Sequence, residues 1–96
     1  MYKLKIRVLA QRDIQEIVNY YDRINPKVAD FFMEELFEEF AIITENPLLF
    51  NTKHKEARSC YLKRFPIGIH IVADDSCVHI IAVIHTSRNP AMWKNR

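Results

Sequence analysis

Two amphipathic helical stripes constrain the fold of this chain more than any other feature of its sequence. One covers residues 10–21 and the other residues 29–43, and in both the apolar side chains recur every three or four positions. Asn25 and Pro26 lie between them, and these residue types suit the N-cap and the first position of a helix. A single helix cannot bury such a stripe by itself. The pattern therefore predicts a helical hairpin that packs against another layer.

Strand patterns flank the hairpin. Residues 2–8 alternate apolar and basic side chains, which is typical of a strand with one buried face. Residues 48–56 look like a loop, and β-rich runs follow at about 57–64, 67–73 and 78–85. The order is β-α-α-β-β-β. We therefore expect an α+β fold in which the helical hairpin packs on a small, mostly antiparallel sheet.

The last strand carries apolar residues on both of its faces. Ile81 and Val83 have the opposite parity to the other apolar residues of the run, so we expect a central strand that is covered from both sides. The main apolar face of the sheet is predicted to consist of Ile67, Ile69, Ile71, Val78, Ile80, Ala82 and Ile84. On the second helix, the aromatic residues Phe32, Phe37 and Phe40 are expected in the core, with spare members available to line a groove for a partner helix.

The composition excludes several classes of protein. A length of 96 residues predicts one domain over residues 1–96, and one glycine with four prolines leaves no linker or glycine-rich phosphate loop. The first residues do not resemble a signal peptide, and no apolar run approaches the roughly 20 residues that span a bilayer. We expect a cytoplasmic protein without membrane contact. Cys60 and Cys77 are therefore expected to be buried, reduced thiols.

The net charge of +2 hides an asymmetry between the two halves of the chain. Residues 1–45 carry six basic and nine acidic side chains, a net charge of −3, whereas residues 46–96 carry eight basic and three acidic, a net charge of +5. This division predicts an anionic partner on one side of the molecule.

Three stretches, in this order, resemble the ParE/RelE superfamily of small bacterial toxins. They are AQRDIQEIVNYY in the first helix, Ala57-Arg58 at the start of the second predicted strand, and the closing IIAVIHTSRNPAMWKNR. The last stretch looks like the ParE branch, in which a strand ends in H-x-x-R and a proline-tryptophan-arginine tail follows. The resemblance covers essentially the whole chain.

Membership of this superfamily implies a toxin of a type II toxin–antitoxin, or plasmid stabilisation, system that a cognate antitoxin neutralises by direct binding. ParE-like members poison DNA gyrase, whereas RelE-like members cut messenger RNA on the ribosome. The ParE-like activity is our first hypothesis and the ribonuclease is the alternative. An inactive interaction module that keeps the fold is a second alternative.

A metal-free ribonuclease needs a base, cations for the phosphate and an acid. Under that alternative His85 would be the base, Arg58 and Arg64 would be the cations, and Tyr61 is a possible acid. The small net charge and the acidic helices weigh against it, because affinity for RNA scales with the number of phosphate contacts. The H-x-x-R-x-P run favours the ParE-like branch.

The remaining expectations concern partners and structural residues. No cofactor is expected, and His54, His70 and His79 have no metal-binding spacing. Trp93 is expected to cover the edge of the core rather than to contact a partner. The residues expected to bind the antitoxin or the target are Arg58, Arg64, Arg88, Lys94 and Arg96.

Overall fold

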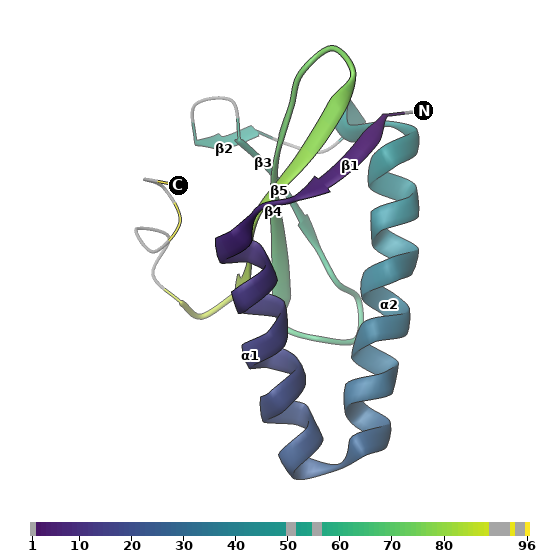
Figure 1. The fold of residues 1–96 in the computed structure, drawn as a ribbon, viewed down its shortest axis with the longest axis vertical. Coiled ribbons are helices and arrows are strands. Elements are labelled where there is room, and N and C mark those ends of the chain that lie inside the picture. Colours follow the sequence, from purple (N-terminus) through teal and green to yellow (C-terminus); the bar gives the residue numbers. More distant parts are fainter. Residues whose placement is uncertain (1, 50–51, 55–56, 89–92, 94–95) are drawn as a thin grey trace.

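The computed structural model describes residues 2–49, 52–54, 57–88, 93 and 96. The elements are β1 (Lys3–Ile6), α1 (Val8–Ile24), α2 (Pro26–Glu45), the 3-10 helix η1 (Pro47–Leu49), β2 (Thr52–His54), β3 (Ala57–Tyr61), β4 (Ile67–Ala73) and β5 (Cys77–His85). The sheet has the strand order β1-β5-β4-β3-β2. Only β1 and β5 pair in parallel, and the other described pairs are antiparallel. The predicted α+β fold, with its helical hairpin and mostly antiparallel sheet, is confirmed (Figure 1).

The element boundaries differ from the expected ones in three places. The expected loop at 48–56 contains most of η1 and all of β2, whose three residues are too few to show an alternation. The first strand ends at Ile6, and Val8 begins α1. The strand expected at 57–64 ends at Tyr61, because the backbone N–H groups that follow turn toward a carboxylate on α2.

Asn25 ends α1 and caps α2, as its position before Pro26 predicts. Its extended backbone, with φ −167°, breaks the helix. Its own N–H still donates to the carbonyl oxygen of Tyr21 at 2.8 Å, and its side-chain oxygen accepts from the N–H of Lys27 at 3.0 Å. One residue therefore satisfies backbone groups of both helices, which allows a very short connection.

The hairpin covers one face of the sheet, and the main core lies between these two layers (Figure 1). Phe32 and Leu36 are fully buried there, and Phe40 is 4% exposed. Phe37 is 59% exposed, so its predicted place in the core is wrong. The reason is the helical rotation of about 100° per residue, which places Phe37 a quarter of a turn away from Leu36. No helix in the described part of the chain is both long and apolar enough to cross a membrane.

The strand β5 lies between β1 and β4 and is buried on both faces, as predicted. A bulge changes which residues share a face: Ala82 pairs with His70, Ile80 pairs with Ile71, and Ile81 between them has no partner on β4. The extra residue reverses the side-chain parity. Val83 therefore joins the helix-facing core, and Ala82 and Ile84 lie on the opposite face, contrary to the expected assignment.

Trp93 forms the centre of the smaller core on that opposite face, which we call the far face. Its side chain is 4% exposed and packs in a cluster with Ala57, Ile81, Ala82 and Ile84. Its ring stacks on the ring of His70, with the centroids 4.1 Å apart and the planes 14° apart. The prediction that Trp93 covers the core is confirmed.

Replacement of Trp93 by alanine should lower the free energy of unfolding by about 3–5 kcal/mol, because the far face would lose its largest buried ring. Trp93→Phe keeps a ring and should lose less than half of that amount. Urea unfolding followed by circular dichroism measures the free energy of unfolding of both variants. Tryptophan fluorescence cannot be used, because Trp93 is the only tryptophan in the chain and both variants lack it. A loss below about 1 kcal/mol for Trp93→Ala would contradict the buried position.

Candidate functional site

A groove lies between α1 and the end of β5, and we call it the α1–β5 groove. Its volume is about 390 Å³, which is within the usual range for binding pockets. Apolar side chains of α1, β4 and β5 contribute to its lining, and charged side chains come from α1 and from the residues after β5. The lining residues are Asp13, Glu16, Ile17, Tyr20, Tyr21, Arg23, Ile67, Val83, Ile84, His85, Ser87 and Arg88.

His85 ends β5 at this groove, and its ring is held by Ser87. The backbone N–H of Ser87 donates to Nδ1 of His85 at 3.1 Å, and the Ser87 hydroxyl oxygen lies 2.7 Å from the same nitrogen. Since Nδ1 accepts from a backbone N–H, the neutral ring carries its proton on Nε2. In this arrangement His85 can donate a hydrogen bond through Nε2.

Asp13 at the groove wall connects α1 with β5 and with the last residue of the sequence. Its carboxylate accepts from the backbone N–H of Val83 at 3.1 Å and from Nη2 of Arg96 at 3.2 Å. Nη1 of Arg96 donates to Oδ2 of Asp13, the oxygen that also accepts from Val83, and to the carbonyl oxygen of Ile81 at 3.2 Å. The pairing of β1 with β5 ends at Ile6 and Ile80, so this ion pair takes the place of a neighbouring strand along the next part of β5.

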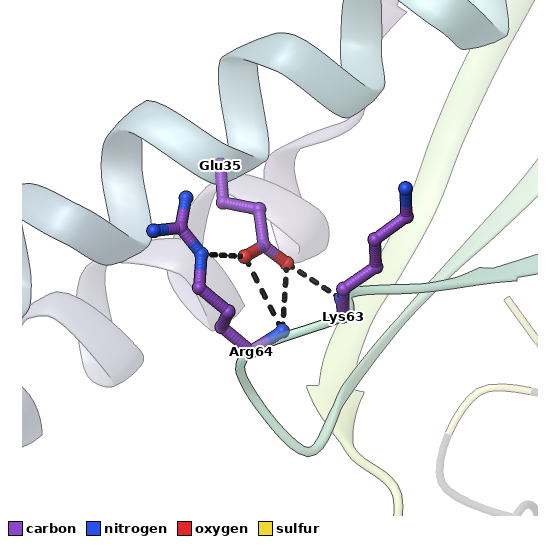
Figure 2. Close-up of polar contacts among 3 residues, drawn as sticks. All are labelled: Glu35, Lys63 and Arg64. Atoms are coloured by element: carbon purple, nitrogen blue, oxygen red, sulfur yellow. Dashed lines mark hydrogen bonds and ion pairs between the residues drawn. The ribbon is translucent and has the colours of Figure 1, made fainter.

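A second buried carboxylate, Glu35 on α2, holds the turn between β3 and β4 (Figure 2). It accepts from the backbone N–H of Lys63 at 2.7 Å, from the backbone N–H of Arg64 at 3.3 Å and from Nε of Arg64 at 3.0 Å. Burial raises the pKa of Glu35, but the bonds from the Arg64 side chain and from the two backbone N–H groups outweigh it and hold the pKa below its ordinary value. Glu35 is therefore a charged anchor near neutral pH.

Glu39, one turn further along α2, accepts a hydrogen bond from the Cys60 thiol, with 3.0 Å between sulfur and oxygen. Burial raises the pKa of Cys60, and the neighbouring Glu39 raises it further. A thiol in this state is a poor nucleophile. Cys60 and Cys77 are both free and buried, which agrees with the prediction for them.

The far face holds a polar pair beneath Trp93. The hydroxyl of Ser59 lies 2.7 Å from Nδ1 of His70, and both residues are buried. Gly68 pairs with Tyr61 on the neighbouring strand, and a Cβ at position 68 would lie 3.0 Å from the Tyr61 ring. The single glycine of the chain therefore makes room for a half-exposed tyrosine ring on this face.

Two of the residues expected to cleave RNA, His85 and Arg58, are not brought together. His85 pairs with Ile67 at one end of β4, whereas Arg58 pairs with Ile71, four residues further along that strand. At about 3.3 Å per residue this separates them by roughly 13 Å along the sheet. Arg64 lies before β4, and its Nε is bound to Glu35 on α2.

The expected partner-binding residues have different surroundings. Arg64 is exposed, Arg88 is exposed at the α1–β5 groove, and Arg58 is half-buried on β3. Arg96 is mostly buried in its ion pair with Asp13. Lys94 lies outside the described residues. Among the described residues no group of three or more His, Cys, Asp or Glu side chains could hold a metal ion.

The sequence did not identify Asp13, Glu35 and Glu39 as buried carboxylates that bind the sheet and its turn. The first of these belongs to the AQRDIQEIVNYY stretch, and the other two lie within an acidic run that has the usual appearance of a solvated helix face. Their only signal was spacing: each follows a residue of an apolar stripe (Ala10, Phe32 and Leu36) by three positions, which places it on the same side of its helix. A carboxylate in that position must be buried with a partner.

The model of the family described as the ParE toxin of the type II toxin–antitoxin system, parDE, matches residues 4–90. The chain belongs to this family. The match includes the helical hairpin, β2 to β5 and all of β1 except Lys3. It also includes every residue that lines the α1–β5 groove, His85 and Arg88 among them.

Solved structures support the fold of this ParE-family chain independently. A chain in the structure of the chromosomal ParDE toxin–antitoxin system from P. aeruginosa is similar to it, with a TM-score of 0.78 and 18% sequence identity. The similarity covers 88% of this chain and 96% of the other. A comparison with curated protein sequences gave no match.

The Glu35→Gln variant should be less stable at pH 7 by about 1–2 kcal/mol, because a neutral amide binds the two N–H groups and Arg64 less strongly. The pKa of Glu35 is lowered by folding, so its contribution is complete above the ordinary value of 4.5 and declines as the pH falls through the lower folded pKa. Urea unfolding from pH 7 to pH 3 should show the variant and the parent chain converging in acid. The exposed neighbour provides a matched control, and Glu34→Gln should show little of this difference.

Asp13 and Arg96 should be strongly coupled in a double-mutant cycle. Asp13→Ala leaves the Val83 N–H and a mostly buried guanidinium without their acceptor, so the coupling free energy should reach about 1–3 kcal/mol. Chemical denaturation of the two single variants and the double variant measures it. A coupling free energy below about 0.3 kcal/mol, as for an exposed ion pair, would show that the Asp13–Arg96 contact does not stabilise the position of Arg96.

Proposed function

We propose that this ParE-family toxin acts by binding DNA gyrase, without hydrolytic chemistry, and that a cognate antitoxin neutralises it by direct contact. The observation that carries the proposal is the match of the ParE family model over residues 4–90. This range includes the H-x-x-R-x-P run at the end of β5, where sequence resemblance already favoured the ParE branch over the RelE branch.

The geometry of the candidate catalytic residues supports action by binding. A ribonuclease needs base and cations around one phosphate. Here Nδ1 of His85 is occupied by Ser87, and Arg58 lies roughly 13 Å from His85 along the sheet at the usual strand rise. In the described part of the chain, His85 and Arg58 therefore do not converge on one phosphate.

The charge distribution supports an antitoxin as the partner. The second half of the sequence carries a net charge of +5, which complements an acidic chain. The similar solved structure is of a ParDE toxin–antitoxin system, and we propose the corresponding arrangement for this chain. Because gyrase is an intracellular target, we also propose that the toxin acts in the cytoplasm.

Induction of the chain in bacterial cells tests the proposed activity. We expect growth arrest and a DNA-damage response while messenger RNA stays intact, and the purified chain should inhibit gyrase supercoiling in vitro. Co-expression of the gene that encodes the antitoxin should restore growth. RNA sequencing measures the integrity of messenger RNA, and a damage-responsive reporter in the same culture measures the DNA-damage response.

Two variants sharpen the result. His85→Ala should leave the damage response within about twofold, as should the exposed control Arg12→Ala. Ribosome-dependent cleavage of messenger RNA that disappears in His85→Ala would overturn the proposal and support the ribonuclease. Harmless expression of a folded chain would support an inactive interaction module instead.

A further inference from the structure

Arg64 is an exposed cation whose orientation is fixed from beneath. Its side chain is 63% exposed, whereas that of Glu35, its partner, is only 5% exposed. The contact with Glu35 uses Nε, and the two terminal nitrogens point away from the carboxylate (Figure 2). Within the described part of the chain these terminal nitrogens make no hydrogen bond or ion pair. The N–H donors of these two nitrogens form the outward end of the planar guanidinium, which we call the fork.

The backbone of the same turn is fixed by the same carboxylate. The N–H groups of Lys63 and Arg64 both donate to Glu35, so the base and the middle of the Arg64 side chain are held together. Phe65 packs on Phe32 of α2, with ring centroids 5.7 Å apart, and this contact holds the other side of the turn. An arginine fixed in this way loses little conformational entropy when it binds a ligand.

We propose that the terminal nitrogens of Arg64 bind a carboxylate of the antitoxin, and that Glu35 is the positioning residue for this contact. The inference rests on the proposed function and adds to it a specific recognition point. A planar fork with two parallel N–H donors matches the two oxygens of a carboxylate. The site lies at the turn between β3 and β4, and Glu35, Lys63 and Arg64 are not among the residues that line the α1–β5 groove.

The surroundings favour one carboxylate over a nucleic-acid backbone. Glu34 and Glu38, on either side of Glu35 in the sequence of α2, are exposed, and Lys63 is the adjacent cation on the turn. A polyanion that extended past Arg64 would meet this acidic helix, and two cations give little affinity for a chain of phosphates. A single acidic side chain on a protein can approach the fork alone.

An exposed apolar ring lies one helical turn before Glu35 on α2. Phe31 precedes Glu35 by four residues, so the two lie on neighbouring turns of the same side of α2, and the Phe31 ring is 50% exposed. A helical side chain leans toward the N-terminus of its helix, which brings the Glu35 carboxylate toward that turn. The partner segment should therefore carry an Asp or Glu close to an apolar side chain.

The test compares Arg64→Lys with Arg12→Lys, an exposed arginine on α1 that serves as the matched control. Arg64→Lys keeps the charge and can still reach Glu35, but it loses the outward fork. We expect the Kd for the purified antitoxin, measured by calorimetry, to rise about tenfold for Arg64→Lys and less than twofold for Arg12→Lys. Glu35→Gln should also raise the Kd, because it releases the fork without touching the partner.

Thermal melting of each variant separates binding from folding. Arg64→Lys should melt within about 2 °C of the parent chain, so a weaker complex at an unchanged Tm indicates the lost fork. The same change of Kd in Arg64→Lys and Arg12→Lys would overturn the proposal. Loss of single-stranded RNA binding in Arg64→Lys, with antitoxin binding intact, would overturn it in favour of a phosphate ligand. If the parent chain itself did not bind the antitoxin, the proposed function would fail first.

Discussion

Buried carboxylates of the helical hairpin fasten it to the sheet. Asp13 of α1 binds the backbone of β5, Glu35 of α2 binds the turn before β4, and Glu39 of α2 binds the Cys60 thiol on β3. A buried carboxylate without partners is strongly unfavourable, so each of these contacts selects one placement of its helix on the sheet. Apolar burial holds the two layers together, and the carboxylates determine their register.

The far side of the sheet depends on a different constraint. The bulge at Ile81 reverses the parity of β5 halfway along and decides which of its apolar side chains face the helices and which face the far side. Trp93 then covers the face that the helices leave open. Arg96 adds a second attachment, because its guanidinium bonds both Asp13 and the carbonyl oxygen of Ile81. Arg96 is therefore attached both to α1 and to the sheet.

This arrangement changes the meaning of the basic residues near the end of the chain. Arg96 forms a mostly buried ion pair with Asp13, and the ring of His85 is hydrogen-bonded to its neighbour Ser87. Arg64 is anchored at Nε while its terminal nitrogens remain exposed. Positive charges that look alike in the sequence thus divide into attachments within the fold and groups available to a partner.

The sequence by itself determined the helices, the order of the elements along the chain apart from η1 and β2, and the capping role of Asn25, because these depend on local periodicity and backbone chemistry. It also predicted the burial of Trp93 and of β5 on both faces. Only the tertiary structure decided the parity of Ala82, Val83 and Ile84, since a bulge forms through pairing with another strand. It likewise decided the roles of Glu35 and Arg64. These residues lie 29 positions apart, and nothing local in either segment indicates that a carboxylate on α2 would hold a turn of the sheet.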